Sequence, residues 1–147
     1  AGAMAQWAAQ AALAAGAGEA IVDNGGDIYL QAVEPAVISL GTGASKLADR
    51  LAFRIEPQQT PLAVCSSSGK MGHSMSLGQC DLATIVAKDA ALADAAATQA
   101  ANLVRTPDDV DAALERIMAI RDIAGVLIVK DDRVGLAGRL PDLVRAG

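Results

Sequence analysis

The chain has 147 residues, of which 52% are hydrophobic, and it carries 17 acidic against 12 basic side chains. This length suits one domain, expected over residues 1–147. The net charge of −5 and the scarcity of aromatic residues argue against a nucleic-acid partner. No apolar run approaches the length of a membrane span, and two cysteines are too few for a disulfide scaffold. We expect a cytoplasmic protein, although a signal ahead of Ala1 stays open.

Hydrophobic periodicity predicts the order of helices and strands along the chain. The sequence opens inside a helical pattern that has no N-cap, which we interpret as a truncated start. This order favours a layered α+β fold, in which Ala-rich helices pack on a mostly antiparallel sheet. The expected helices cover 2–15, 89–104 and 107–124, and the expected strands cover 20–23, 28–33, 37–40, 51–55, 62–65, 82–87, 126–129 and 134–137.

The first polar segment that could bind a ligand is the run Asn24, Gly25, Gly26 and Asp27, between two apolar stretches. Asn-Gly in this setting predicts a β-hairpin, because both residues tolerate a positive φ. In a second interpretation, the paired glycines let a flat or phosphorylated ligand touch the backbone while Asp27 accepts a hydrogen bond. The residues alone leave both interpretations open.

A second polar segment contains Ser66, Ser67, Ser68, Gly69 and Lys70. Hydroxyls, free N–H groups and a cation suit the binding of phosphate or carboxylate. The spacing of a P-loop is absent. A solvated turn is the alternative.

Cys65 and His73 flank this serine segment and are candidate catalytic residues. His73 is the only histidine and lies in a polar stretch. With Lys70 and His73 nearby, the thiolate of Cys65 would be favoured, and a reactive Cys65 should be partly exposed. The alternative is a buried, inert Cys65, and we expect Cys80 to pack as a small apolar residue in either case.

Asp94 and Thr98 are four residues apart in an Ala-rich helical pattern, so they project from the same helix face. A carboxylate and a hydroxyl could give a divalent metal two oxygen ligands and leave room for water and phosphate. We expect them to face one cavity shared with Gly25, Gly26 and the serine segment. The alternative is an exposed Asp94 and a Thr98 that bonds its own backbone.

Four segments in this order resemble an uncharacterised branch of the ApbE superfamily, whose best-known members are FAD:protein FMN transferases. The branch shows Ala-Gly-Ala-x-Ala, then Asn-Gly-Gly-Asp-Ile, then Cys-[Ser/Thr]-Ser-Ser-Gly, then Ala-Leu-Ala-Asp-Ala-Ala-Ala-Thr. The corresponding segments here are Ala1–Ala5, Asn24–Ile28, Cys65–Gly69 and Ala91–Thr98. The resemblance covers essentially the whole chain and implies an ApbE-like fold that lacks a sizeable N-terminal region.

The resemblance also implies cofactors, namely FAD or FMN together with Mg²⁺. Asp94 and Thr98 match residues that help bind the metal at the FAD pyrophosphate, and Gly25, Gly26 and Asp27 match residues that line the flavin site. The chain departs from the transferases at Ala5, where they carry Lys, and at Gln10, where they carry Asp. Their His-x-x-Asp-Pro-x-Thr-Gly segment has no counterpart, which implies that the machinery for FMN transfer is degraded.

Two functional hypotheses follow. The first is a flavin- or nucleotide-binding protein, which could be a divergent transferase, with a divalent metal on Asp94 and Thr98. The second is a persulfide sulfur carrier that uses Cys65, since the branch resembles proteins linked to sulfur assimilation and homocysteine synthesis in anaerobes. A small-molecule ligand is the expected partner, and a homodimer and a ligand-free structural domain stay open.

Overall fold

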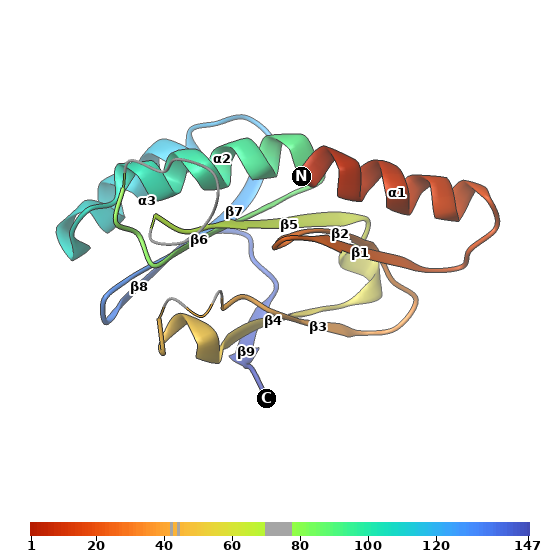
Figure 1. Ribbon diagram of the computed structural model, residues 1–147, viewed down its shortest axis with the longest axis horizontal. Helices are drawn as coiled ribbons and strands as arrows, with labels where there is room; N and C mark the ends of the chain where they lie inside the picture. Colours follow the sequence, from red (N-terminus) through yellow and green to blue (C-terminus); the bar gives the residue numbers. More distant parts are fainter. Residues whose placement is uncertain (42, 44, 70–77) are drawn as a thin grey trace.

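The computed structural model describes residues 1–41, 43, 45–69 and 78–147, which form three layers (Figure 1). Helices α1 (Gly2–Ala14), α2 (Ala90–Leu103) and α3 (Val110–Met118) make the upper layer. A six-stranded sheet lies beneath them, and a three-stranded sheet forms the lower layer. The seven pairings between the described strands are antiparallel. The predicted α+β class with mostly antiparallel strands is confirmed.

The large sheet has the strand order β1-β2-β5-β6-β7-β8, and the small sheet has the order β3-β4-β9. Three short 3-10 turns precede the elements that follow them in the chain: η1 precedes β4, η2 precedes β5 and η3 precedes α3. The bounds are β1 Ala20–Asn24, β2 Asp27–Gln31, β3 Ala36–Ser39, η1 Ala48–Arg50, β4 Leu51–Ile55, η2 Pro57–Gln59, β5 Leu62–Ser67, β6 Leu82–Ala87, η3 Pro107–Asp109, β7 Ile123–Lys130, β8 Arg133–Gly138 and β9 Asp142–Arg145.

The large sheet separates two hydrophobic cores, and β6 is buried along its whole length between them. Successive side chains of a strand point to opposite faces. On β5, Cys65 therefore packs with the helices, whereas Val64 packs against the small sheet. On β6, Ile85 and Val86 divide in the same way.

Alanine brings the helices close to the sheet. The buried face of α2 consists of Ala90, Ala93, Ala96, Ala97, Ala100 and Ala101. Asp89 caps the start of this helix, because its carboxylate accepts a hydrogen bond from the N–H of Leu92 at 2.9 Å. In the described part of the chain, no helix is both long and apolar enough to cross a membrane.

The structure corrects three of the predicted boundaries. β5 continues to Ser67, so Ser66 and Ser67 lie in a strand and not in a loop. The helix expected over 107–124 is the turn η3 followed by a shorter α3, and β7 already begins at Ile123, which pairs with Ala87 of β6. β9 was not predicted, because it is a four-residue strand whose partner β4 is remote in the sequence.

The close helix–sheet packing predicts that Ala97→Leu destabilises the protein by about 1–3 kcal/mol, since a fully buried alanine leaves no room for three more carbons. Ala95→Leu, on the exposed face of the same helix, is the matched control and should change stability by less than about 0.5 kcal/mol. Urea denaturation measures both changes. Equal stability of the two variants would contradict the packing.

Candidate carboxylate site between the helices and the sheet

The β1–β2 hairpin begins the site. Gly25 and Gly26 form its two-residue turn with φ of +67° and +96°, and Asp23 accepts a hydrogen bond from the N–H of Gly26 at 2.9 Å. A Cβ built on either glycine would meet no atom within 4 Å. The predicted hairpin is confirmed, and the glycines are required there for a positive φ rather than for a close contact.

Asp27 follows this turn as the first residue of β2 and pairs with Cys65 of β5. Its side chain lies on the helix side of the sheet and is only 7% exposed. The atom Oδ1 of Asp27 is buried and has no hydrogen-bond partner. A buried carboxylate oxygen without a partner costs free energy, so this atom needs an explanation.

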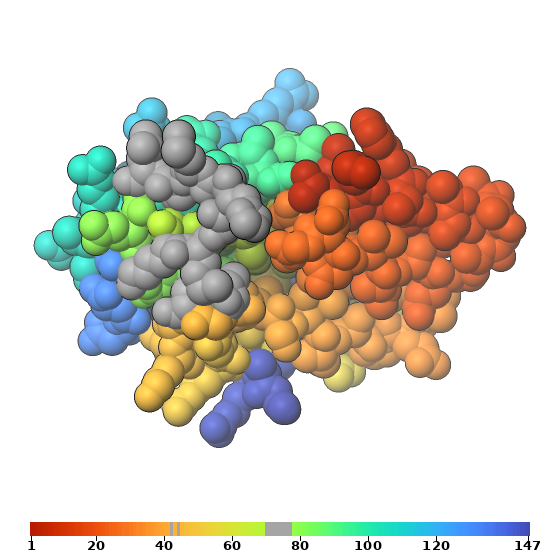
Figure 2. All heavy atoms as spheres, in the orientation of Figure 1, coloured from red at the N-terminus to blue at the C-terminus, as the bar shows by residue number. Residues whose placement is uncertain are grey.

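Asp94 of α2 meets Asp27 from above, and the start of α1 holds it there. Its Oδ2 accepts hydrogen bonds from the N–H of Gly2 at 2.9 Å and from the amino group of Ala1 at 3.1 Å. A Cβ on Gly2 would lie 2.5 Å from the carbonyl oxygen of Ala90, so only glycine allows this approach. The first residues of α1 thus lie beside the start of α2 and above the hairpin (Figures 1 and 2).

The two carboxylates influence each other's ionisation. Burial, and then the negative charge of Asp94, raise the pKa of Asp27 from its ordinary 3.8 to about 6. Burial also disfavours the charged form of Asp94, but the hydrogen bonds from Gly2 and Ala1 outweigh it and leave the pKa of Asp94 below its usual value. Near neutral pH both carboxylates are therefore ionised, and the charged amino group of Ala1 lies beside the carboxylate of Asp94.

Thr98 does not complete a ligand pair with the carboxylate of Asp94 in this structure. Its hydroxyl donates to the backbone carbonyl of Asp94 at 3.3 Å, which is the local bonding that we gave as the alternative. Among the described residues, no group of three or more His, Cys, Asp or Glu side chains is placed to hold a metal ion. The acidic side chains that could bind a metal at this site are thus those of Asp27 and Asp94.

The serine segment is tied into the sheet. The hydroxyls of Ser66 and Thr84 are 2.8 Å apart, and the hydroxyl of Ser68 donates to the carbonyl of Cys80 at 3.2 Å. Gly69 also donates its N–H to Cys80, at 2.8 Å. Ser67 is half-buried at the end of β5. Lys70 lies outside the described residues. Ser66 and Ser67 are therefore strand residues, and Ser68 follows directly after β5.

Ser66, Gly25 and Gly26 do share a cavity, but Asp94 and Thr98 do not line it. This cavity, of about 330 Å³, lies between the hairpin and β3, on the small-sheet side. The single shared cavity that we expected is wrong, because the alternation of β2 and β5 sends Asp27 and Cys65 to one face and Ile28 and Ser66 to the other. The other lining residues are Asp23, Ile28, Ile38, Ser39, Leu40, Gly41 and Val64.

Cys65 is fully buried, and its Sγ donates to the carbonyl of Ala90 at 3.6 Å. Burial, and then the negative charge of Asp27, raise the pKa of the Cys65 thiol. The structure thus has the buried Cys65 that we gave as the alternative, and not the partial exposure that a reactive Cys65 should show. His73, the other candidate catalytic residue, lies outside the described residues. Cys80 is also buried, as expected.

Sequence reasoning missed the role of Gly2. The motif that contains it was used for the resemblance, but nothing in one sequence shows that its N–H bonds Asp94, 92 residues away. A glycine one residue inside a helix is the only hint, since glycine there costs helix stability.

The fold and the site define an α+β protein in which a pair of carboxylates lies between a helix layer and the central sheet. The family model described as "AbpE bacteria" matches residues 1–133, and the chain belongs to this family. Among similar proteins, UPF0280 protein MJ1526 of Methanocaldococcus jannaschii is 40% identical over 130 residues, which are 85% of this chain and 53% of that protein. A UPF0280 protein of Methanothrix thermoacetophila is 42% identical over 149 residues, which are 99% of this chain and 61% of that protein. The chain thus spans between about half and three fifths of the length of these relatives.

The raised pKa of Asp27 predicts a pH-dependent stability. A group whose pKa is higher in the folded state stabilises the fold fully below its ordinary value of 3.8 and loses this contribution as pH rises through about 6. The free energy of unfolding of Asp27→Asn, relative to that of the native protein, should therefore rise by on the order of 2 kcal/mol as the pH goes from 4 to 7.5. Denaturation in EDTA at several pH values measures the difference. Asp132→Asn, an exposed control, should track the native protein.

The two thiols should label slowly in the native state, because both are buried. We expect timed alkylation with peptide mapping to show Cys65 and Cys80 protected until the protein is denatured. Rapid native labelling of Cys65 would show that this thiol is accessible, as a sulfur carrier requires.

Proposed function

We propose that this chain binds a flavin or another nucleotide through its pyrophosphate, together with a divalent cation such as Mg²⁺ at Asp27 and Asp94. One observation carries the proposal: the buried Oδ1 of Asp27 has no partner, and the carboxylate of Asp94 is close enough to raise the pKa of Asp27. A bound cation would satisfy this oxygen and offset the repulsion between the two charges.

The donor set fits a hard cation. Mg²⁺ is commonly bound by one or two carboxylates, with phosphate oxygens and water completing its six ligands. The oxygen of Thr98, one helical turn from Asp94, keeps a lone pair while its hydrogen is donated. The cation would neutralise phosphate charge. Since two carboxylates leave most of its coordination open, we expect cation and pyrophosphate to bind together.

The resemblance to the ApbE superfamily supports the same ligand class, because Asp94, Thr98 and the Gly25–Asp27 segment match its metal and flavin positions. The cavity below the hairpin supports it in a second way. Ile28, Ile38 and Val64 give this cavity apolar walls, and its 330 Å³ falls within the range of about 300–1,000 Å³ for small-molecule sites. A flat ring could occupy it while the pyrophosphate lies beyond the edge of the hairpin.

The proposal covers binding and not FMN transfer. Ala5 and Gln10 stand where the transferases carry Lys and Asp. Ala5 is buried in the helix–sheet core, so it offers no charged group to a reacting phosphate. Phosphoryl transfer depends on positioning and on neutralising charge, and the loss of such groups removes its usual basis.

Thermal unfolding tests the proposal. FAD and MgCl₂ together should raise the melting temperature by several degrees, and by more than the sum of their separate effects, since a ligand at a hundred times its Kd stabilises by about 2.7 kcal/mol. Asp94→Asn and Asp27→Asn should abolish the Mg²⁺-dependent part, and Asp132→Asn should keep it. ADP in place of FAD separates recognition of the pyrophosphate from recognition of the flavin ring.

Absence of any Mg²⁺-dependent shift with FAD and ADP would contradict the proposal. An equal shift in Asp94→Asn would contradict the assigned site while leaving nucleotide binding in place.

A further inference from the structure

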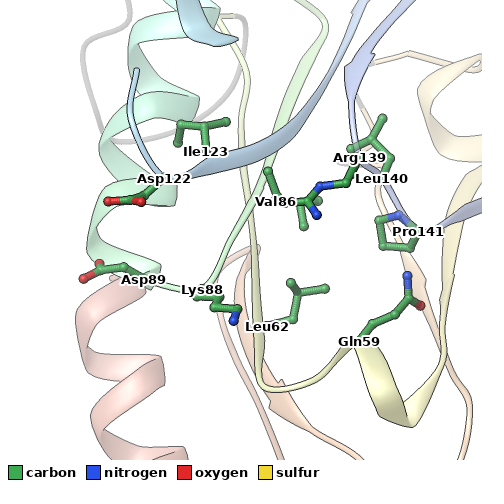
Figure 3. Close-up of a pocket in the computed structure, with 11 residues that line it drawn as sticks. Gln59, Leu62, Val86, Lys88, Asp89, Asp122, Ile123, Arg139, Leu140 and Pro141 are labelled. Atoms are coloured by element: carbon green, nitrogen blue, oxygen red, sulfur yellow. The ribbon is translucent and has the colours of Figure 1, made fainter. Parts of the chain in front are cut away.

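A second cavity, of about 670 Å³, lies at the end of the large sheet where β6 leads into α2 (Figure 3). Its lining comes from η2, β5, β6, β7 and the segment that joins β8 to β9. None of the residues assigned above to nucleotide or metal binding lines it. Its volume falls within the usual range for small-molecule sites.

The floor of this cavity is apolar. Leu62, Val86 and Ile123 are buried and still contribute to its wall, and Leu140 and Pro141 close the side next to the small sheet. An apolar group placed here would leave water and cover the side chains of two adjacent strands, β5 and β6.

Two cations border this floor. The side chains of Lys88 and Arg139 make no hydrogen bond or ion pair with any described residue, and Figure 3 shows both extending their nitrogen ends toward Leu62 and Val86. Two acidic residues also line the cavity, but their carboxylates lie on the α2 side of the view. One of them, Asp89, is engaged in capping α2. The positive charge is therefore the charge that faces the apolar floor.

A β-bulge in β7 lies next to Arg139 and bonds its backbone. Val86 pairs with Gly125 and Ala87 pairs with Ile123, so Ala124 is an extra, bulged residue in β7. The carbonyl of Ala124 accepts a hydrogen bond from the N–H of Arg139 at 2.7 Å.

A glycine is also required at this point. A Cβ on Gly125 would collide with the carbonyl oxygen of Arg139 and with the side chain of Leu140. Bulges re-aim side chains and are over-represented next to active sites. This bulge fixes the segment that carries Arg139 against the sheet, which is the kind of support that a binding residue needs.

We propose that this cavity binds a small carboxylic acid with an apolar body. The carboxylate would lie on Arg139, whose planar guanidinium matches its two oxygens, with Lys88 as the second charge. The apolar body would cover Leu62 and Val86. An uncharged apolar ligand would leave two cations partly desolvated without a partner, and inorganic phosphate would leave the floor uncovered.

Titration followed by ¹H–¹⁵N correlation spectra tests the site, with phenylacetate as the probe and phenylacetamide as its uncharged match. Phenylacetate should shift the amides of Ile123, Ala124 and Arg139 saturably, and phenylacetamide should bind at least tenfold more weakly. Arg139→Gln should weaken phenylacetate at least tenfold, Arg139→Lys should weaken it less, and Arg116→Gln, an exposed control on α3, should leave it unchanged.

Several outcomes would overturn the inference: no saturable shift near Ala124, equal affinity for the acid and the amide, or native affinity in Arg139→Gln with an otherwise unchanged spectrum. Competition by inorganic phosphate at the same concentration as phenylacetate would show that the cavity binds any anion. It would overturn the inference that the cavity also recognises the apolar body of the acid. The experiment is run without added nucleotide or divalent cation, so its result does not depend on the nucleotide and metal site.

Discussion

Coverage of β6 on both faces is the constraint on which the rest of the structure depends. Since every residue of this strand is buried, its neighbours β5 and β7 must also divide their side chains between the helix core and the small-sheet core. This division points the side chains of Asp27 and Cys65 toward α2, and it points the side chain of Ser66 toward the small sheet. Side chains that are neighbours in the sequence consequently face two different layers of the fold.

Hydrophobic periodicity and turn residues predict much of the fold from the sequence. The two glycines of the hairpin, the order of helices and strands, and the α+β class all follow from local pattern. Ser66 was mistaken for a loop residue because a polar strand residue gives no apolar alternation, and its partner Thr84 is 18 residues away. β9 and the contact between Gly2 and Asp94 depend on segments brought together only by the complete fold, so one sequence does not reveal them.

The buried alanines of α2 also determine how close the two carboxylates of the site lie to each other. Small side chains on α2 let the helix approach the sheet closely enough for a carboxylate on the helix to affect one on a strand. A larger core residue at Ala93 or Ala97, both fully buried, would push the helix away and separate the two acids. The same packing explains why Cys65 is buried, since its thiol lies under α2 against the carbonyl of Ala90. The position that looked most nucleophilic in the sequence is therefore part of the core.

The close packing also limits what can neutralise Asp27. The buried alanines of α2 pack against the sheet here, and no lysine or arginine side chain among the described residues forms an ion pair with Asp27. The amino group of Ala1, 3.1 Å from the carboxylate of Asp94, lowers the pKa of Asp27, but burial and the charge of Asp94 outweigh it. Asp94 already takes the N–H of Gly2, whereas Oδ1 of Asp27 has no donor. Protonation of Asp27 removes one of the two carboxylate charges below a pH of about 6, so the close packing of α2 makes the charge of this site depend on pH.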